Sequence, residues 1–504
     1  MSSVSRRSFL AGSAASFATG PALGQRARPG AAPAAPSSEV DAIIVGAGAA
    51  GIAAARRLAT AKRSFILIEA SNRIGGRCFA ETKSFGVPFD RGAHLIHNPD
   101  TNPLAKFAPQ AGVEIYPAPS GQRIRIGRRN ARDSELEDYL AATVRASRAI
   151  SDAARGARDV DCASILPKDL GEWRQTVEFA LGPYNSGKDL NEISAADLSR
   201  SADRDVGAFC RQGYGALLAK LAGGLPVQFD TAVKLVDITS RGAKVEASTT
   251  KGTITGRHMI ITASTNAVLD RIKFDGGLPK RHEEAFQKLK LGSFDHIALE
   301  LTGNPLGLTR DDLVFEKSSG PRTAALLANV GGTPLSVIEV GGRFGRELAG
   351  QGDKAMVEFA VEWLTGLFGT NVKKAVGRTQ TTQWNSDPWT QGAFSSASPG
   401  GQAARRILME PIRNRVFFAG EAVHETSWGT VAGAWESGNR AADAVIRRIL
   451  GQPEPAPAAA DIERPSDRPV RATKPSDQRP TQGSGASWCY TNPNDSYCQK
   501  PSRR

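Results

Sequence analysis

The chain has 504 residues, of which 40% are hydrophobic and 23% charged, a balance that suits a globular protein of two or three interleaved domains. No run of eighteen apolar residues occurs, which argues against a membrane span, and the net charge of +13 is not gathered into a dense basic stripe, which argues against nucleic-acid binding. The five cysteines and six histidines are scattered and match neither a disulfide framework nor the spacing of metal ligands. We therefore expect no metal site.

Residues 1–38 are predicted to be an export signal followed by a linker. The adjacent arginines Arg6 and Arg7 stand before Phe9 and Leu10 and a mildly hydrophobic stretch, a pattern typical of twin-arginine export to the periplasm. The alternative is a disordered basic terminus, which the hydrophobic pair directly after the arginines disfavours.

The first predicted strand leads into a glycine-rich turn. Residues 40–45 are β-rich, residues 46–51 read Gly-Ala-Gly-Ala-Ala-Gly, and residues 52–61 have the composition of a helix. The next strand, 65–68, ends at Glu69, an acid placed to accept hydrogen bonds from an adenosine ribose. The strand, turn, helix and strand together predict a Rossmann-like α/β unit that binds a dinucleotide.

Each glycine of this turn has a physical reason. Gly46 makes the tight turn, Gly48 lets the backbone approach a pyrophosphate, and Gly51 permits close packing of the helix on the strand. The N-terminus of the following helix then stabilises the phosphate charge, and Ala49 and Ala50 of the turn are expected to contact the cofactor.

Two further motifs follow at once, and they resemble one family. Residues 73–77 read Arg-Ile-Gly-Gly-Arg, and residues 89–94 read Phe-Asp-Arg-Gly-Ala-His. This pairing resembles the flavoprotein monoamine oxidase superfamily, whose paired glycines and arginine wrap the FAD pyrophosphate. The resemblance implies FAD contacts from four residues of these motifs: Gly76, Arg77, Gly92 and Ala93.

The resemblance continues in chain order over about residues 39–450, and is nearest to the polyamine oxidase and histone demethylase branch. The later matches are residues 213–215 with 227–233, 258–263, 384–395, 417–422 and 429–434. It implies that the backbone of Val233 meets adenine. Ser264 departs from the pattern, since a proline is usual there.

The resemblance implies an α/β fold in which a Rossmann-like FAD-binding domain is interleaved with a substrate domain of mixed sheet and helices. Helical periodicity is visible at 135–154 and 356–368. The expected segments are an FAD-binding domain at 39–130, 226–280 and 386–450, a helical substrate part at 131–225, a sheet part at 281–385, and a disordered tail at 451–504.

The closing signature has its own physical logic. A buried strand at 416–419 leads to Gly420 and Glu421, where a carboxylate is placed to accept from a ribityl hydroxyl. A helix is predicted to start at Thr430 and Val431, so that its positive end faces the flavin C2 carbonyl.

The flavin is expected to be noncovalent. Members of the family that bind FAD covalently carry a cysteine where this chain has Ala393. Cys78 lies beside Arg77 in the segment expected to wrap the pyrophosphate, and we do not expect it to substitute.

The chemistry near flavin N5 departs from the family. His296 stands where many members place a water-bridging lysine, and an imidazole with an ordinary pKa of about 6.5 would serve as a base or water anchor, with an inflection in the pH profile. The alternative is a histidine that only packs. One wall of the amine cage falls at Phe394, and the other at Thr430, which is not aromatic, so that Trp428 is the expected replacement.

The resemblance implies oxidation of a small-molecule amine, with O₂ or a periplasmic cytochrome as the expected electron acceptor. Two alternatives remain open. An L-amino-acid oxidase or a C–C desaturase is one, for which Arg91, Arg123 or Arg125 would bind a carboxylate; a catalytically silent FAD-bound scaffold is the other. In the tail, Cys489 and Cys498 either close a small loop or remain free thiols.

Overall fold

The computed structural model describes residues 39–204, 206–238 and 244–453. The expected export signal, the pair Cys489 and Cys498 and all but the first three residues of the expected tail lie outside these ranges. No helix of the described ranges is both long and apolar enough to cross a bilayer.

The first sheet has eight strands and contains the expected nucleotide-binding unit. Its core is parallel, because β2 and β13 flank β1, β10 extends the sheet beyond β2, and β20 runs alongside β13. An antiparallel extension follows β13 through β12 and β11. The strands in chain order are β1 (Val40–Val45), β2 (Phe65–Ile68), β10 (Val227–Gln228), β11 (Val233–Asp237), β12 (Val245–Thr249), β13 (Gly252–Ile261), β14 (Lys273–Phe274) and β20 (Val416–Phe418).

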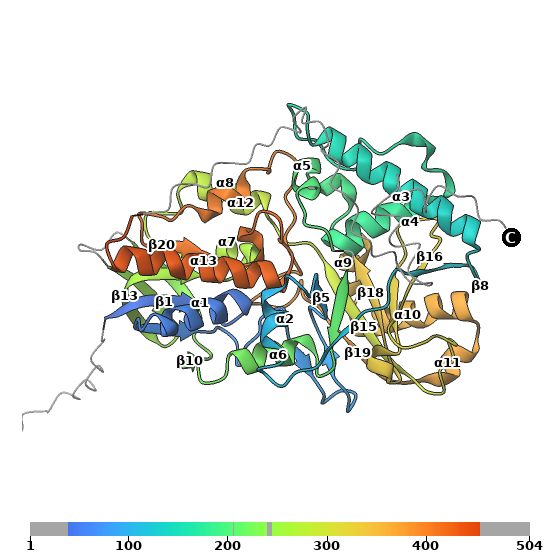
Figure 1. The fold of residues 1–504 in the computed structure, drawn as a ribbon, viewed down its shortest axis with the longest axis horizontal. Coiled ribbons are helices and arrows are strands. Elements are labelled where there is room, and N and C mark those ends of the chain that lie inside the picture. Colours follow the sequence, from blue (N-terminus) through green and yellow to red (C-terminus); the bar gives the residue numbers. More distant parts are fainter. Residues whose placement is uncertain (1–38, 205, 239–243, 454–504) are drawn as a thin grey trace, which may run out of the picture. The chain divides into compact units, whose positions relative to one another are not determined.

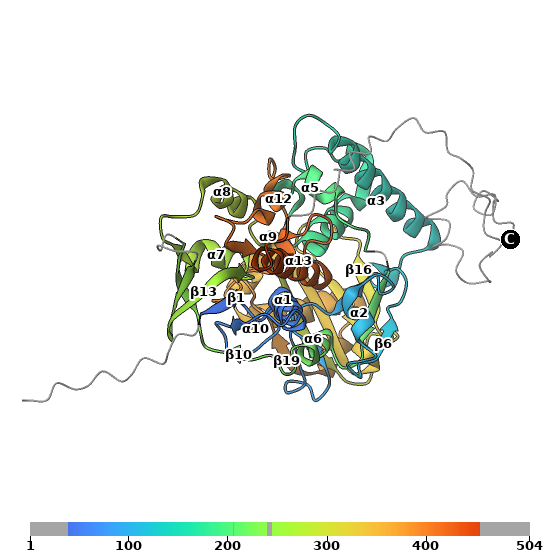
Figure 2. The ribbon, with the colours of Figure 1, turned by 60° about the vertical axis from the view of Figure 1, so that its left-hand side comes forward.

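Both faces of this sheet are covered, which fits the nearly unbroken apolar run of β1. Ile43 points to the face covered by α7 (Thr265–Arg271), α8 (Lys280–Lys288) and α12 (Ala404–Met409). Ile44 points to the opposite face, where α1 (Ala49–Thr60) packs along α13 (Val431–Ile449), as Figures 1 and 2 show.

The second sheet has seven strands in the order β19-β15-β18-β17-β16-β7-β8. One of its strands, β7, pairs in parallel with β16. This strand comes from a segment that the sequence analysis assigned to the FAD-binding domain. The expected boundary at residue 130 is therefore too late for this segment. The strands are β7 (Arg123–Ile126), β8 (Arg129–Asn130), β15 (Phe294–Leu301), β16 (Asp312–Glu316), β17 (Ala325–Ala328), β18 (Leu335–Gly341) and β19 (Val376–Thr381).

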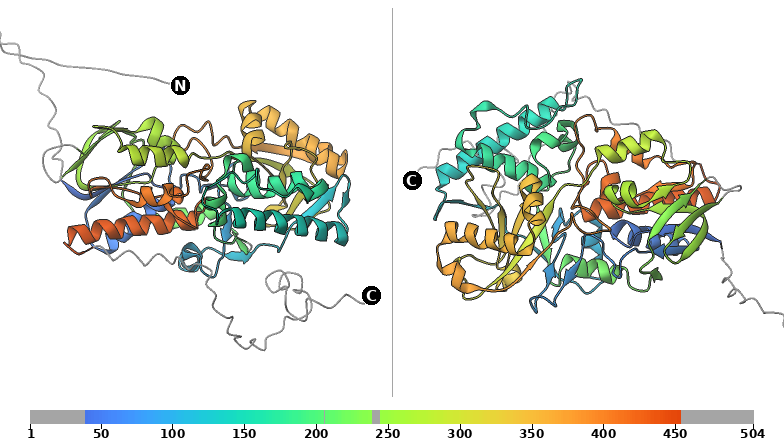
Figure 3. Two further views of the ribbon diagram at one scale, coloured as in Figure 1. Left: turned by 90° about the horizontal axis from the view of Figure 1, so that it is seen from above. Right: turned by 180° about the vertical axis from the view of Figure 1, so that it is seen from behind.

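Alternate residues of this sheet belong to two different cores. Val314 and Leu326 pack against α10 (Asp353–Phe368), which Figure 3 shows in orange on one side of the sheet. Their neighbours Phe315 and Ala325 pack with α3 (Asp133–Ala153) and α4 (Arg174–Phe179) on the other side. The helices expected at 135–154 and 356–368 are confirmed.

The remaining short elements lie outside the two large sheets. They are β3 (Ala80–Glu81), β4 (Phe89–Asp90), β5 (Leu95–His97), β6 (Ile115–Pro117), β9 (Gly207–Cys210), α2 (Pro103–Phe107), α5 (Ala195–Ser199), α6 (Tyr214–Leu221), α9 (Gly342–Gly350), α11 (Asn371–Ala375) and the short helices η1 (Lys168–Trp173), η2 (Ala180–Tyr184), η3 (Leu190–Glu192), η4 (Val330–Gly332) and η5 (Glu421–Val423). The segment 227–233, matched as one strand, is divided between β10 and the start of β11 on opposite sides of β1.

Candidate functional site

A cavity of about 1580 Å³ is lined by residues of both sheets. It exceeds the 300–1,000 Å³ typical of a pocket for one small ligand, so it has room for a dinucleotide and a second molecule. All the predicted site residues line it except Gly51 and Trp428. The lining set is Gly46, Gly48, Ala49, Ala50, Glu69, Gly76, Arg77, Gly92, Ala93, Val233, His296, Phe394, Gly420, Glu421, Thr430 and Val431.

The glycine turn has the geometry that a pyrophosphate needs. Gly46 has a φ of +102°, which favours glycine, and a Cβ on Gly51 would lie 1.8 Å from the carbonyl oxygen of Gly46. A Cβ on Gly48 would meet no atom nearer than the oxygen of Gly75 at 4.0 Å, so this backbone is open to the cavity. The N-terminus of α1 has neither a side-chain cap nor an acid in its first turn. Its free N–H groups therefore suit an anion.

Glu69 lies at the end of β2, as predicted, and its carboxylate is held in place. One oxygen accepts from the N–H of Ala47 at 2.8 Å, and the other accepts from the N–H of Ser71 at 2.9 Å. A carboxylate has about four acceptor positions, so room remains for a hydroxyl. The ribose contact stays a prediction.

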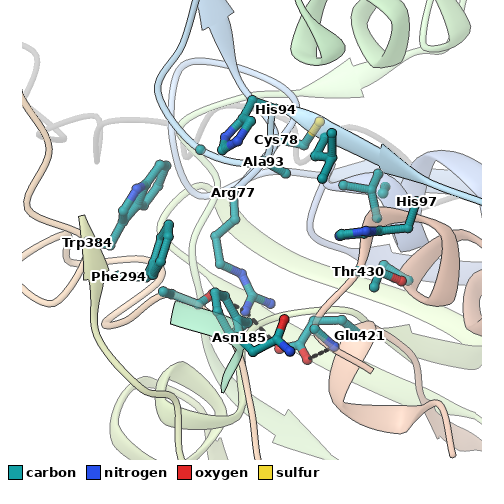
Figure 4. Close-up of a pocket in the computed structure, with 18 of the residues that line it drawn as sticks. Arg77, Cys78, Ala93, His94, His97, Asn185, Phe294, Trp384, Glu421 and Thr430 are labelled. Atoms are coloured by element: carbon teal, nitrogen blue, oxygen red, sulfur yellow. Dashed lines mark hydrogen bonds and ion pairs between the residues drawn. The ribbon is translucent and has the colours of Figure 1, made fainter. Parts of the chain in front are cut away.

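Glu421 is the centre of a hydrogen-bond network. Nη1 of Arg77 lies 2.8 Å from one oxygen of Glu421 and also donates to the carbonyl of Ala393, a pairing visible in Figure 4. The backbone and hydroxyl of Ser395 and the N–H of Gly429 donate to the same carboxylate. These donors fill the acceptor positions, so Glu421 joins three segments of the cavity wall. The expected ribityl contact stays a prediction, and it requires one of these donors to give up its place.

Thr430 acts as the N-cap of α13. Its hydroxyl oxygen accepts from the N–H of Gly433 at 3.0 Å, and its O–H donates to the carbonyl of Ser427. The helix therefore begins at Val431, as expected, with its positive end at the cavity.

The aromatic lining differs from the expected cage. Trp428 is fully buried and does not line the cavity; its ring packs against the guanidinium groups of Arg204 and Arg405, at 5.1 and 4.7 Å. The prediction of Trp428 as the second wall is wrong, because its side chain is buried in the core and does not reach the cavity.

Phe394 instead continues into a row of rings that the sequence did not indicate. The ring centroid of Phe294 lies 5.8 Å from that of Phe394 and 6.0 Å from that of Tyr184, and all three residues line the cavity. Tyr184 comes from the helical segment without a family motif. Only the alternation of β15, which places Phe294 on the same face as His296, could have pointed to Phe294.

His296 lies on β15 and lines the cavity with only 3% of its side chain exposed. Its Nδ1 is 3.2 Å from the carbonyl oxygen of Asp90. Burial lowers the pKa of His296 to about 3, and nearby His94 lowers it further. This lowered pKa argues against the expected imidazole inflection near 6.5, because the site disfavours the charged ring.

Two further titratable residues join His296 and were missed. His94, from the loop before β5, and Glu339, on β18, bring their ligand atoms within 4.8 Å of each other and of His296. The sequence indicated no such cluster because its three members lie on separate segments, and spacing along the chain detects only local ligand sets.

The arginines considered as carboxylate binders lie elsewhere. Arg123 pairs with Asp312, Arg125 stacks on Phe368, and Arg91 donates to the carbonyl of Thr381; none of the three lines the cavity. The alternative of an L-amino-acid oxidase therefore lacks the arginines that were expected to bind the substrate carboxylate.

Comparison with known proteins places this site in context. The sequence profile of the family described as flavin containing amine oxidoreductase matches residues 49–446. The chain is 26% identical over 448 residues to lysine-specific histone demethylase 2 of Homo sapiens, which covers 80% of this chain and 53% of that protein. It is 25% identical over 450 residues to polyamine oxidase 3 of Oryza sativa subsp. japonica, with 81% and 90% covered. The chain thus spans about half the length of the histone demethylase it resembles.

Solved structures share the fold. A double mutant of putrescine oxidase superposes with a TM-score of 0.70 at 18% identity, covering 82% of this chain and all of that chain. Cyclohexylamine oxidase from Brevibacterium oxydans IH-35A gives a TM-score of 0.69 with the same identity and coverage. At this identity the likeness shows the fold alone, and the expected α/β fold is confirmed.

Proposed function

This chain belongs to the flavin-containing amine oxidoreductase family, and on that premise we propose that it binds FAD and oxidises a small-molecule amine to an imine, which water hydrolyses to an aldehyde or ketone. The observation that carries the proposal is one continuous cavity with an anion-binding glycine turn and a row of aromatic rings. When bound, FAD supplies the acceptor for the hydride of the amine α-carbon.

Different residues of the chain would bind different parts of FAD and of the amine. The backbone at Gly48 and Gly76 and the free N-terminus of α1 would hold the pyrophosphate, and Glu69 would accept from the ribose. The positive end of α13 would stabilise negative charge on the flavin ring. The rings of Phe294 and Phe394 would orient the amine.

Noncovalent attachment is part of the proposal. Position 393 is an alanine, and burial raises the pKa of the Cys78 thiol well above its ordinary value, which keeps it unreactive. Acid precipitation should release all the yellow colour into the supernatant. Colour that remains with the pellet would show a covalent flavin.

The reaction is tested by mixing the purified holoprotein with amines in the absence of oxygen. The panel is benzylamine, cyclohexylamine, putrescine and spermidine, and the readout is bleaching of the flavin absorbance. Bleaching by at least one amine is expected. A flavin that dithionite reduces but no amine reduces would favour the catalytically silent scaffold.

The electron acceptor and the location are also proposed. Oxygen, with release of peroxide, or a periplasmic cytochrome would reoxidise the flavin, and Arg6 and Arg7 would direct the folded protein to the periplasm. Replacing both arginines by lysine should retain the protein in the cytoplasm. Unchanged export of this variant would refute the twin-arginine route.

His296 is proposed to act near flavin N5 as a neutral hydrogen-bonding group or water anchor. His296→Ala should slow flavin reduction with unchanged FAD content, and His296→Lys introduces the residue that many family members carry. If neither change moves the reduction rate by more than about twofold, or about 0.4 kcal/mol of barrier, His296 only packs.

A further inference from the structure

Three acceptor groups face one another at the wall of the cavity. Register places Glu339 of β18 directly opposite His296 of β15, on the cavity side of the second sheet. One carboxylate oxygen of Glu339 lies 3.5 Å from Nε2 of His296 and 3.4 Å from Nε2 of His94. The side chain of Glu339 is only 1% exposed, and neither of its oxygens has a hydrogen-bond partner in the described part of the chain.

Both imidazoles present a lone pair to this carboxylate. A carbonyl oxygen only accepts, so the nitrogen of His296 that faces the carbonyl of Asp90 carries the hydrogen, and Nε2 is left as an acceptor. The backbone of Gly92 lies near the ring of His94 and favours its charged form, while Nε2 of His94 faces Glu339. When Glu339 is ionised the cluster thus lacks a donor, and buried acceptors without a donor are costly.

An alkylammonium group supplies what is missing. It carries three N–H donors and a positive charge on one nitrogen, and the cluster offers two imidazole nitrogens and a carboxylate. We propose, resting on the function proposed above, that His94, His296 and Glu339 receive the charged amino group of the substrate and that Glu339 takes one of its protons.

The charges around the cluster fit this role. Burial raises the pKa of Glu339 to about 8 and lowers the pKa of His94 to about 4, so that Glu339 is the group that exchanges a proton near neutrality. Tyr184 of η2 also faces Glu339, and burial raises its pKa well above the ordinary value, which keeps it neutral. Arg91 contributes positive charge near His296, and the carboxylate of Asp90 is turned away to the N–H groups of α6.

The proton step is balanced without a further reactant. An N–H bond of the ammonium breaks and its electron pair stays on nitrogen, while an O–H bond forms on Glu339. The products are a neutral amine and a carboxylic acid. Loss of hydride from the α-carbon needs this neutral amine, since the nitrogen lone pair stabilises the developing cation.

The test compares Glu339→Gln with the wild-type holoprotein, using the fastest amine of the panel in anaerobic stopped-flow mixing from pH 6 to 10. Glu316→Gln is the matched control, because Glu316 lies on β16 of the same sheet, bonds to Thr323 and does not line the cavity. The wild-type rate should rise with pH and level off above about 8.

Glu339→Gln should keep its FAD, and its rate of flavin reduction at pH 7 should be at least 100-fold lower than that of the wild type. This factor is the low end for loss of a general base. The deficit should shrink to less than about tenfold at pH 10, near the ordinary ammonium pKa of about 10.4, because much of the amine is then already neutral. The control should stay within about twofold of wild type.

A rate of Glu339→Gln within about threefold of wild type at pH 7 would overturn this inference and leave the amine oxidation standing. Failure of every amine to reduce the wild-type flavin would instead refute the proposed function. A stoichiometric metal ion in the purified protein that disappears in Glu339→Gln would also overturn the inference, since the same three groups would then be its ligands.

A second measurement on the wild type covers the case in which Glu339→Gln loses its flavin. Benzyltrimethylammonium has the charge but no N–H donor, so it should inhibit at least 30-fold more weakly than benzylammonium at pH 7. Equal inhibition would show that the site does not use N–H donors, and the proposal would be wrong.

Discussion

At the scale of single residues, two glycines of the turn after β1 have different tasks. A Cβ at Gly51 would collide with the carbonyl of Gly46 at 1.8 Å, whereas a Cβ at Gly48 would meet nothing nearer than 4.0 Å. Gly51 is therefore needed for the close packing of α1 on β1, whereas Gly48 leaves space for the ligand.

The two valine variants should separate these tasks. Gly48→Val should fold with wild-type circular dichroism but be purified colourless, because the side chain would occupy the place of the pyrophosphate. Gly51→Val should be recovered unfolded or insoluble, because backbone cannot give way by the distance required. A yellow Gly48→Val would contradict the assignment of this backbone to the dinucleotide.

Glu339 should also make stability depend on pH. Its pKa in the folded protein is about 8, above the ordinary value of 4.5, so its favourable contribution is complete below about pH 4.5 and is lost as the pH rises to about 8. The free energy of unfolding of Glu339→Gln, relative to that of the wild type, should therefore increase by up to about 1.4 kcal/mol for each pH unit within this window. Above the window the difference between the two proteins should be constant.

Urea unfolding of both proteins at pH 5 to 9 measures this difference. The two imidazoles act in the opposite direction, since their lowered pKa values cost stability as the pH falls below 6.5, but that contribution is common to both proteins. Glu362→Gln, at a side chain that is 76% exposed, controls for the substitution itself. A pH-independent difference would show that Glu339 is not the titrating group.

At the scale of elements, a buried ion pair joins α5 to α12. Arg405 meets Asp197 through two hydrogen bonds of 2.7 Å, and both side chains are 3% exposed. The same guanidinium donates to the hydroxyl of Ser395 and the carbonyl of Ala422, which flank Glu421 in the cavity wall. The pair therefore fixes the segments that carry Phe394 and Glu421.

Removing one partner of this pair should be strongly destabilising. Arg405→Met leaves Asp197 buried without its cation, and we expect a loss of about 3–5 kcal/mol in the free energy of unfolding. Arg322→Met removes the exposed pair with Glu362 and should cost no more than about 1 kcal/mol. Denaturant titrations of the two variants give both numbers, and equal losses would contradict the argument from burial.

At the scale of the whole described unit, the cavity is lined by residues of both sheets. A ligand that fills it contacts both sheets at once and binds only the folded chain. Its free energy of binding therefore adds to the stability of the fold.

Added FAD should accordingly raise the thermal midpoint of the protein stripped of flavin. A free FAD concentration of 100 times Kd should add about 2.7 kcal/mol to the free energy of unfolding. Gly48→Val, if folded, should show no such rise. A stripped wild-type protein that FAD does not stabilise would argue against FAD as the ligand of this cavity.

The sequence alone determined the parts of the molecule that depend on local interactions. The strand ending at Glu69 and the start of α13 at Val431 are each specified by a few neighbouring residues, and the structure places them as expected. The glycine turn after β1 is also present, but α1 begins at Ala49, three residues before the expected start at Ile52. Helices at 135–154 and 356–368 followed from periodicity, because an apolar face repeats within one element.

Tertiary structure decided what depends on contacts between distant segments. The pairing of β7 with β16, the burial of Trp428 and the meeting of His94, His296 and Glu339 result from strand register and packing that no local pattern contains. The altered pKa values follow for the same reason, since desolvation depends on everything that surrounds a group. The sequence thus indicated a flavin-containing family through local motifs, while the groups proposed to meet the substrate emerged only because two antiparallel strands set Glu339 opposite His296.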